Sequence, residues 1–284
     1  MICKRKLKNI IIINLAYFFS LLCIGFLVWV IVDLARKGIP HINMDFVLSG
    51  YNDSKGLHGI APMIVTTMWM ICVTLVIAMP IGIFSAVYLV EYSRPGFIVN
   101  IIRLATENLA GIPSIIYGLF GYVFFKNFLK LGFSLLSGSL TLSVMVLPSV
   151  VRITEEALKS VDPMYRDGSM ALGATRLYTI IHIVLPCTVP QVLSAVLLSM
   201  GRVIGETAAV YFTAGTVYRF PEGIMSSGRT LAVHLYILAK ESGNFEEAYA
   251  TACVLIIITA IIHFAVNRVT RTVSKRTGKE KQKT

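Results

Sequence analysis

Six long stretches of this sequence contain no charged side chain. They run over residues 9–32, 56–90, 108–125, 131–151, 177–201 and 248–267. A helix needs about 20 apolar residues to cross the roughly 30 Å hydrocarbon layer of a bilayer, so each stretch can span a membrane. The composition agrees, because 56% of the residues are hydrophobic, 14% are charged and the mean hydropathy is +0.74. The sequence therefore predicts an all-α integral membrane protein with six transmembrane helices.

The distribution of positive charge predicts the orientation of these spans. The net charge is +11, which in a soluble protein would suggest a nucleic-acid partner. If both termini lie inside, the inner segments hold 17 Lys and Arg residues and the outer loops hold 8. Such an excess is typical of cytoplasmic loops. We therefore assign the charge mainly to topology, with membrane lipid as the surroundings and no nucleic acid expected.

These boundaries divide the chain into four parts. The first span follows a basic start and is longer than a secretory signal core, and no small-residue cleavage site follows it, so we interpret it as uncleaved. The expected location is a membrane, crossed several times, with both termini cytoplasmic. The parts are a cytoplasmic N-terminus (1–8), the first transmembrane helix with its outer loop (9–55), a five-helix core (56–267) and a basic cytoplasmic tail (268–284).

Two charged residues fall within the fifth span and its apolar continuation. Arg202 and Glu206 lie four residues apart, so on a helix they would share a face and their side chains could pair. An arginine near the bilayer centre costs at least about 2.5–3.5 kcal/mol. The pair is either a structural ion pair or part of a solute path. An arginine fork fits a tetrahedral oxyanion and stays charged at every physiological pH.

Small residues recur every four positions beside these charges. Gly201, Gly205 and Ala209 form a stripe offset by one position from Arg202 and Glu206. Such stripes allow helix backbones to approach closely within a membrane. The stripe predicts that the fifth helix packs tightly against a neighbour.

The loop between the fourth and fifth spans, residues 153–186, predicts a helix–turn–helix on the cytoplasmic side. Asp162 and Pro163 form a good helix start, and Gly173 supplies the left-handed residue that often ends a helix. A second helix is expected over residues 175–184, ending at Pro186. An exposed amphipathic helix of this kind typically docks into a groove on a partner.

The same loop resembles that of permease subunits of ABC importers, which carry the pattern E-A-A-x3-G-x9-I-x-L-P. The second half fits at Gly173, Ile183, Leu185 and Pro186, whereas the E-A-A positions hold Asp167, Gly168 and Ser169. The stretches GIAPMIVTT (59–67), ENLAGIPSIIYGLFG (107–121), GRVIGETAAV (201–210) and LAVHLYILAKESGNFEEAYATA (231–252) are similar to the phosphate-type permeases, and among them to the PstA type. The resemblance covers about residues 56–267.

This resemblance implies a location in a bacterial or archaeal cell (inner) membrane, a fold, partners and site residues. The implied fold is that of a type I ABC importer permease, paired as a heterodimer with a PstC-like sister permease. Two copies of a PstB-like ATPase subunit would bind below, and a PstS-like extracytoplasmic phosphate-binding protein would dock above. Arg202 and Glu206 match the family's charged pair in the substrate pathway, and Arg152 is a second matching cation, either in the pathway or an anchor at the inner surface. The residues implied to couple to the ATPase are Asp167, Gly168, Ser169, Ala171, Gly173, Ile183, Leu185 and Pro186.

The sequence lacks the motifs of a self-sufficient enzyme. It contains no G-x-x-x-x-G-K-[ST], H-E-x-x-H or G-x-S-x-G run, so we expect neither a nucleotide-binding site nor a cofactor or metal. The expected function is transport of inorganic phosphate driven by separate ATPases. Two alternatives stay open, namely an ABC permease for phosphonate, sulfate or molybdate, and a self-contained secondary anion carrier.

Overall fold

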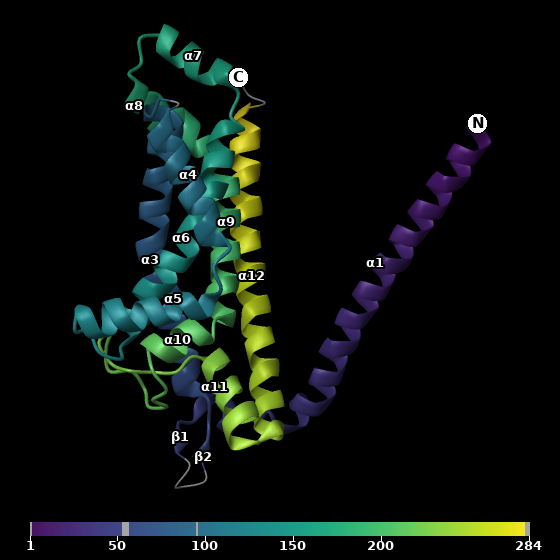
Figure 1. Ribbon diagram of the computed structural model, residues 1–284, viewed down its shortest axis with the longest axis vertical. Coiled ribbons are helices and arrows are strands. Elements are labelled where there is room, and N and C mark those ends of the chain that lie inside the picture. Colours follow the sequence, from purple (N-terminus) through teal and green to yellow (C-terminus); the bar gives the residue numbers. More distant parts are fainter. Residues whose placement is uncertain (1, 53–56, 95, 282–284) are drawn as a thin grey trace.

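The computed structural model describes residues 2–52, 57–94 and 96–281, and shows a bundle of long helices with one helix leaning away from it (Figure 1). The long helices are α1 (Ile2–Gly38), α3 (Ala61–Val87), α6 (Leu135–Lys159), α9 (Leu185–Gly205) and α12 (Phe245–Lys281). The shorter ones are α2 (Met44–Leu48), α4 (Phe97–Ala110), α5 (Ser114–Gly121), α7 (Pro163–Ala171), α8 (Arg176–Thr179), α10 (Ala208–Thr213) and α11 (Leu231–Ile237). Two short strands, β1 (Tyr51–Asn52) and β2 (Leu57–His58), pair antiparallel with Tyr51 opposite His58.

The core lies where α3 and α6 pack along each other, with α9 beside them. Its buried residues include Met70 on α3, Leu142 and Met145 on α6, and Ile204 on α9. The two ends of the bundle differ. The N-terminus, the C-terminus and α7 lie at one end, and the β-hairpin, α10 and α11 lie at the other (Figure 1).

Five helical spans are long and apolar enough to cross a membrane, and they correspond to five of the six predicted spans. They are Ile12–His41, Ala61–Tyr92, Leu135–Lys159, Arg176–Gly205 and Phe245–Thr272. The predicted third span, residues 108–125, falls on a broken pair of helices. Phe97–Ala110 and Ser114–Phe128 meet there at an angle of 103°.

The bend follows from the residues between the two halves. Pro113 has no backbone N–H and disfavours a helical residue before it, so α4 ends at Ala110 and α5 begins at Ser114. The Tyr117 hydroxyl donates a hydrogen bond to the Leu109 carbonyl at 2.7 Å. This bond ties the start of α5 to the end of α4, in addition to the backbone bond that the Leu109 carbonyl accepts from the Ile112 N–H at 3.2 Å.

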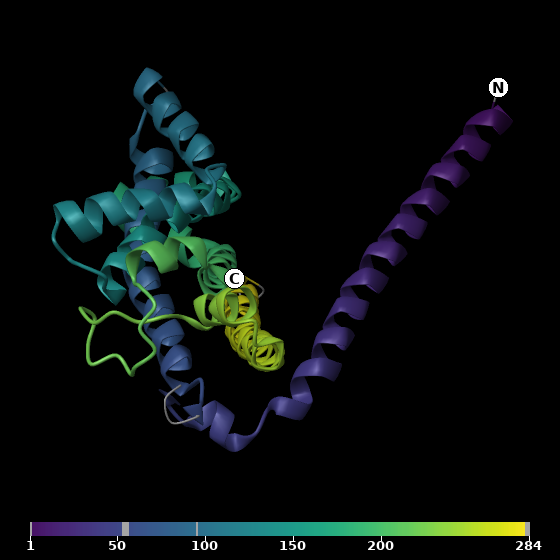
Figure 2. The ribbon, with the colours of Figure 1, turned by 60° about the horizontal axis from the view of Figure 1, so that its bottom comes forward.

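Helix α1 contacts the bundle mainly at its C-terminal end (Figures 1 and 2). There Gly38 lies against α12, where a side chain would collide with the Tyr249 carbonyl oxygen and the Cys253 sulfur at 2.5 Å. None of the most apolar window of this span is buried. At the other end of the chain, α12 continues through most of the predicted basic tail to Lys281, and Met1 and residues 282–284 lie outside the described residues.

The fifth span differs from its prediction at both ends. The second loop helix does not end at Pro186, because α8 continues through a π-helical turn (Ile180–Val184) into α9 as a single span. A π-helical turn shifts the hydrogen-bonding register, which accommodates a proline without an N–H.

At the far end the helix stops at Gly205, and Glu206 is extended (φ −74°, ψ 124°). The prediction that Arg202 and Glu206 share a helix face is therefore wrong.

The small-residue stripe is also divided by this break. Gly205 has no neighbouring atom within 4 Å of the position of a Cβ, and Gly201 has only His263 Nε2, at 3.5 Å. The close packing occurs elsewhere, between α5 and α10. A Cβ on Gly118 would lie 2.9 Å from the Ala209 Cα and 3.2 Å from the Ala208 carbonyl oxygen. Ala209 thus packs tightly as predicted, but against Gly118 and without Gly201 or Gly205.

A polar cluster is buried near the β-hairpin, at the end of the bundle opposite α7. His234 on α11 is fully buried, and Arg229 is 6% exposed. The Tyr51 ring lies 5.3 Å from the His234 ring, and the Arg229 guanidinium lies 4.8 Å from the Tyr51 centroid. Burial, together with the charge of Arg229, lowers the pKa of His234 to about 3. The imidazole is therefore neutral at physiological pH.

The two glycine environments predict effects of different size for the same substitution. Gly118→Ala forces the backbones of α5 and α10 apart, and we expect a loss of about 1–3 kcal/mol in the free energy of unfolding. Gly205→Ala meets open space, so its effect should stay well below that. Thermal melting of the two purified variants in detergent tests this, and equal losses would contradict the packing described.

Acid should destabilise the folded protein through His234. An unfolded histidine has a pKa near 6.5, so between about pH 6.5 and 3 the unfolded chain binds a proton that the folded chain does not. The free energy of unfolding then falls as the pH falls. We expect the melting temperature to drop by a few degrees between pH 7 and pH 5, and to drop less in His234→Phe. The matched control is His41→Asn at an exposed histidine, and identical pH dependence in His234→Phe and wild type would contradict the prediction.

Candidate functional site

Arg202 lies in the last turn of α9, partly buried inside a membrane span. Within the described part of the chain, no ion pair or hydrogen bond involves its guanidinium. It borders a pocket of about 390 Å³ between α6, α9 and α12, which is lined by Val146, Ser149, Leu197, Leu198, Ser199, Gly201, Arg202 and His263. A permanent cation is therefore available to a ligand in this pocket.

Glu206 has a local partner of its own. Its Oε1 accepts a hydrogen bond from the Ala209 N–H at 3.1 Å, and the residue is 9% exposed. The carboxylate thus caps the first turn of α10, where the N–H groups carry partial positive charge. This cap explains why α9 ends at Gly205, and it leaves Arg202 without an ion-pair partner among the described residues.

Arg152 lies on α6, closer to the α7 end of the bundle. Its side chain is 66% exposed, and its Nε donates to Glu156 Oε1 at 3.1 Å. It borders a second pocket of about 390 Å³, lined by Arg103, Thr106, Glu107, Ala110, Pro148, Ser149, Arg152, Ile153, Glu155, Glu156, Lys159 and Leu198. Ser149 and Leu198 border both pockets. The structure therefore places Arg152 and Arg202 along one continuous face of the bundle.

Sequence reasoning missed a charge cluster at the edge of the second pocket. Glu155 Oε1 lies 2.7 Å from both Arg103 Nη2 and Lys159 Nζ, which joins α4 to α6. Only the Glu155–Lys159 spacing of four residues on a helix gave a signal. Arg103 belongs to a different segment, so its contribution depends on the tertiary structure.

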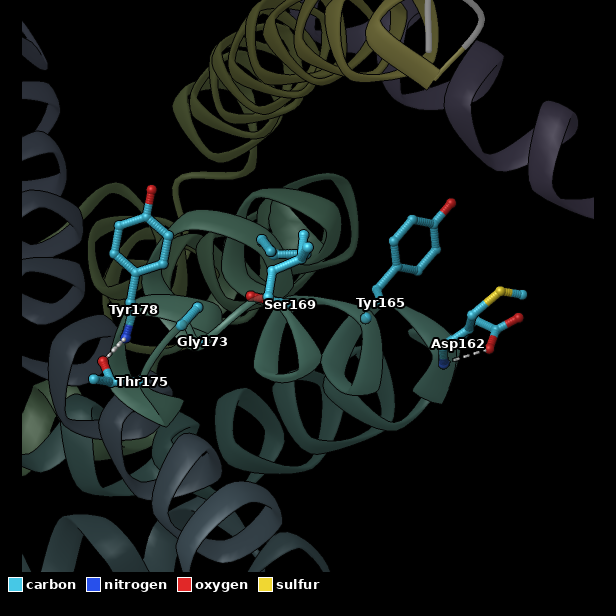
Figure 3. A pocket seen from close by; sticks show the side chains of 11 residues that line it. Asp162, Tyr165, Ser169, Gly173, Thr175 and Tyr178 are labelled. Atoms are coloured by element: carbon cyan, nitrogen blue, oxygen red, sulfur yellow. Dashed lines mark hydrogen bonds between the residues drawn. The ribbon is translucent and has the colours of Figure 1, made fainter.

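The loop helix forms as the sequence predicts. The Asp162 carboxylate accepts a hydrogen bond from the Met164 N–H at 2.9 Å at the start of α7. Gly173 has φ +88°, the left-handed conformation that ends the helix. Together α7 and α8 border a groove of about 960 Å³ lined by Asp162, Met164, Tyr165, Gly168, Ser169, Leu172, Gly173, Ala174, Thr175, Tyr178 and Ile183 (Figure 3).

The residues assigned to this loop from the family pattern fall into two groups. Asp167, Gly168 and Ala171 are exposed on α7, as is Gly173 in the turn that follows. Ser169 is buried, and its hydroxyl lies 2.9 Å from the Thr179 hydroxyl on α8. The others belong to the continuous span, where Ile183 lines the groove, Leu185 packs against a buried cluster and Pro186 is exposed.

Helix α7 is fixed to the bundle by an ion pair that the sequence analysis missed. Arg166 donates from Nη2 and Nε to Glu91 Oε1 at 2.8 and 3.0 Å. It also donates to the Val161 and Leu158 carbonyls, both at 2.8 Å. The side chains of Glu91 and Arg166 are 6% and 18% exposed. Because Glu91 ends an uncharged run, it resembled a span boundary, and only folding brings it to Arg166.

Removing the Glu91 charge should loosen α7. Breaking one side of a buried pair costs about 3–5 kcal/mol because the remaining charge stays desolvated, so Glu91→Gln should lower the melting temperature and expose the loop to trypsin. The control is Asp33→Asn, since the Asp33–Lys37 pair has side chains 41% and 49% exposed and such pairs contribute about 0–1 kcal/mol. Equal trypsin resistance of Glu91→Gln and wild type would show that the pair does not hold α7.

Comparison with known proteins relates this arrangement to transport. Residues 78–279 match the family described as binding-protein-dependent transport system inner membrane component. The probable ABC transporter permease protein YqgI of Bacillus subtilis (strain 168) is 29% identical over 265 residues, which cover 86% of this chain and 90% of the relative. The phosphate transport system permease protein PstA of Mycobacterium leprae (strain TN) is 32% identical over 270 residues, covering 92% and 88%. PstA of Pasteurella multocida (strain Pm70) is 32% identical over 210 residues, covering 74% and 75%.

Solved structures share the fold. A bacterial alginate ABC transporter, in complex with an alginate pentasaccharide-bound periplasmic protein, matches with a TM-score of 0.66 and 14% identity over 91% of this chain and 96% of that one. The inward-facing MetNI methionine ABC transporter matches with a TM-score of 0.56 and 21% identity over 73% and 91%. The predicted type I importer permease fold is thereby confirmed, and the chain is a multi-pass membrane protein. It belongs to the family of binding-protein-dependent transport system inner membrane components, and PstA phosphate permeases are among its relatives.

Proposed function

We propose that this chain is the PstA-type permease subunit of an ATP-driven importer of inorganic phosphate. The observation that carries the proposal is Arg202, an intramembrane cation with no ion-pair partner among the described residues, beside a pocket of about 390 Å³. An intramembrane charge marks a substrate path by default, and a guanidinium binds tetrahedral oxyanions through a two-pronged fork. The choice of phosphate rests on the relatives that are named phosphate permeases.

The proposed path follows the face that carries both pockets. It passes from the Arg202 pocket, over Ser149 and Leu198, to the pocket of Arg152, Arg103 and Lys159. An anion would move along this face between Arg202 and the second pocket, where Glu155 and Glu156 already pair with the three cations. The opposite wall would come from the sister permease in a heterodimer.

The proposed orientation places α7 and both termini in the cytoplasm. The two ATPase subunits would bind there, with one of them seating on the α7 groove, whose exposed apolar residues include Met164 and Leu172. The extracytoplasmic phosphate-binding protein would dock at the opposite end, near α11 and the β-hairpin. These positions agree with the excess of Lys and Arg in the segments on the α7 side.

The geometry supports a direct mechanical coupling between the ATPases and the path. Helix α7 is joined through Arg166 and Glu91 to the π-helical turn (Tyr88–Tyr92) that follows α3, and through Ser169 and Thr179 to α8. Residues Arg176–Gly205 form one continuous span, with α8 at its start and Arg202 near its end. A displacement of α7 by the ATPases would therefore move the helix that carries Arg202, changing the side from which the cation is accessible.

Labelled-phosphate uptake tests the proposal in cells carrying all four kinds of subunit. We expect uptake to require this chain and ATP and to be unaffected by excess sulfate. Arg202→Gln should lower uptake at least about 10-fold, the factor expected for loss of a hydrogen bond from a charged donor, while the subunits still co-purify. Arg202→Lys should retain part of the activity, because it keeps the charge but loses the fork.

Other outcomes would separate the alternatives. Uptake that survives ATP depletion and follows an ion gradient would indicate a secondary carrier, and competition by sulfate would indicate a broader oxyanion permease. If Arg202→Gln prevents co-purification, Arg202 has a structural role. Arg152→Gln serves as the matched variant: a comparable loss of uptake assigns Arg152 to the path, and normal uptake assigns it to the inner surface as an anchor.

A further inference from the structure

We propose that His263 is a second substrate-contacting residue, which faces Arg202 across the same pocket and accepts a hydrogen bond from the protonated oxyanion. The inference rests on the proposed function. His263 lies on α12 within the membrane span Phe245–Thr272 and is partly buried. It lines the pocket of about 390 Å³ together with Arg202. The pocket thus joins two ionisable side chains from two different helices.

The imidazole of His263 borders two pockets, because Gly201, the residue next to the ring, has no side chain to separate them. His263 Nε2 is 3.5 Å from the position that a Cβ on Gly201 would take. On the other side of Gly201, His263 lines a second pocket of about 450 Å³, together with Gly201, Ile204, Gly205, Leu255, Ile256, Thr259 and Ala260. Glycine at position 201 therefore leaves the ring open to both pockets, which gives this residue of the stripe a role other than helix packing.

Three polar side chains border the Arg202 pocket without a hydrogen-bond partner in the described part of the chain: Arg202, His263 and Ser199. Neither ring nitrogen of His263 has a partner among the described residues. The same holds within residues 2–52, 57–94 and 96–281 for the hydroxyl of Ser199, which is 3% exposed. Polar groups removed from water are normally hydrogen-bonded, and an ionisable side chain in a span usually serves a function. A polar ligand in the pocket would supply the missing partners.

The donor and acceptor chemistry identifies the class of ligand. Arg202 can only donate hydrogen bonds, whereas a neutral imidazole has one N–H donor and one acceptor nitrogen. Hydrogen phosphate needs both kinds of partner, because its P–O⁻ oxygens accept and its P–OH group donates. Sulfate at neutral pH has no O–H group and needs donors only. Arg202 with His263 therefore suits a protonated tetrahedral oxyanion.

Phosphate uptake by the complete importer, reconstituted in proteoliposomes, tests this role. The initial rate is measured against the concentration of phosphate-loaded binding protein for wild type, His263→Leu and His263→Gln. We expect His263→Leu to lower the maximal rate about 10-fold, as for loss of a hydrogen bond to a charged group. The half-saturating concentration of the loaded binding protein should not change. Gln keeps a donor and an acceptor, so His263→Gln should retain most of the rate.

The controls separate this inference from the proposed function. Phe264→Leu, at a neighbouring side chain that is 63% exposed, should transport like wild type. If wild type takes up no phosphate, the proposed function fails. If wild type is active and His263→Leu is equally active, the inference is overturned and the proposed function stands. Should His263→Leu fail to assemble, His263→Ala is compared with His263→Gln, and equal rates in these two would also overturn the inference.

Discussion

The structure depends on one constraint, that backbone N–H and C=O groups cannot remain without hydrogen bonds in hydrocarbon. A side-chain hydrogen bond is therefore present at each of two breaks between helices. The Tyr117 hydroxyl bonds the Leu109 carbonyl at the bend between α4 and α5. The Glu206 carboxylate bonds the Ala209 N–H at the break between α9 and α10. Each of these hydrogen bonds uses a polar side chain that a continuous helix would not need.

The break at Glu206 has a consequence for the charge on the preceding turn. On a continuous helix, Arg202 and Glu206 would neutralise each other at small cost. Because the carboxylate caps α10, the guanidinium lies beside a pocket without an ion-pair partner in the described residues. The same break separates Gly201 and Gly205 from Ala209, so the glycines border open space, and Gly201 leaves His263 accessible.

At the other end of the bundle, charge pairs hold separate segments together. The Glu91–Arg166 pair joins the π-helical turn after α3 to α7, and Glu155 joins α4 to α6 through Arg103. Partial burial strengthens these pairs, and the remaining exposure limits the desolvation cost. The loop helix is thus a firmly attached part of the bundle and not a flexible appendage.

The sequence by itself determined the features that depend on neighbours along the chain. Uncharged runs located five spans and part of the sixth, Asp162 and Gly173 set the ends of α7, and the loop pattern indicated the family. Only the tertiary structure decided which distant residues meet: Arg166 with Glu91, Gly118 with Ala209, and His263 with the Arg202 pocket. The reason is physical. Helical periodicity and capping act over about four residues, whereas the path of the chain after Gly111–Pro113 and after Gly205 is set by packing between helices far apart in the sequence.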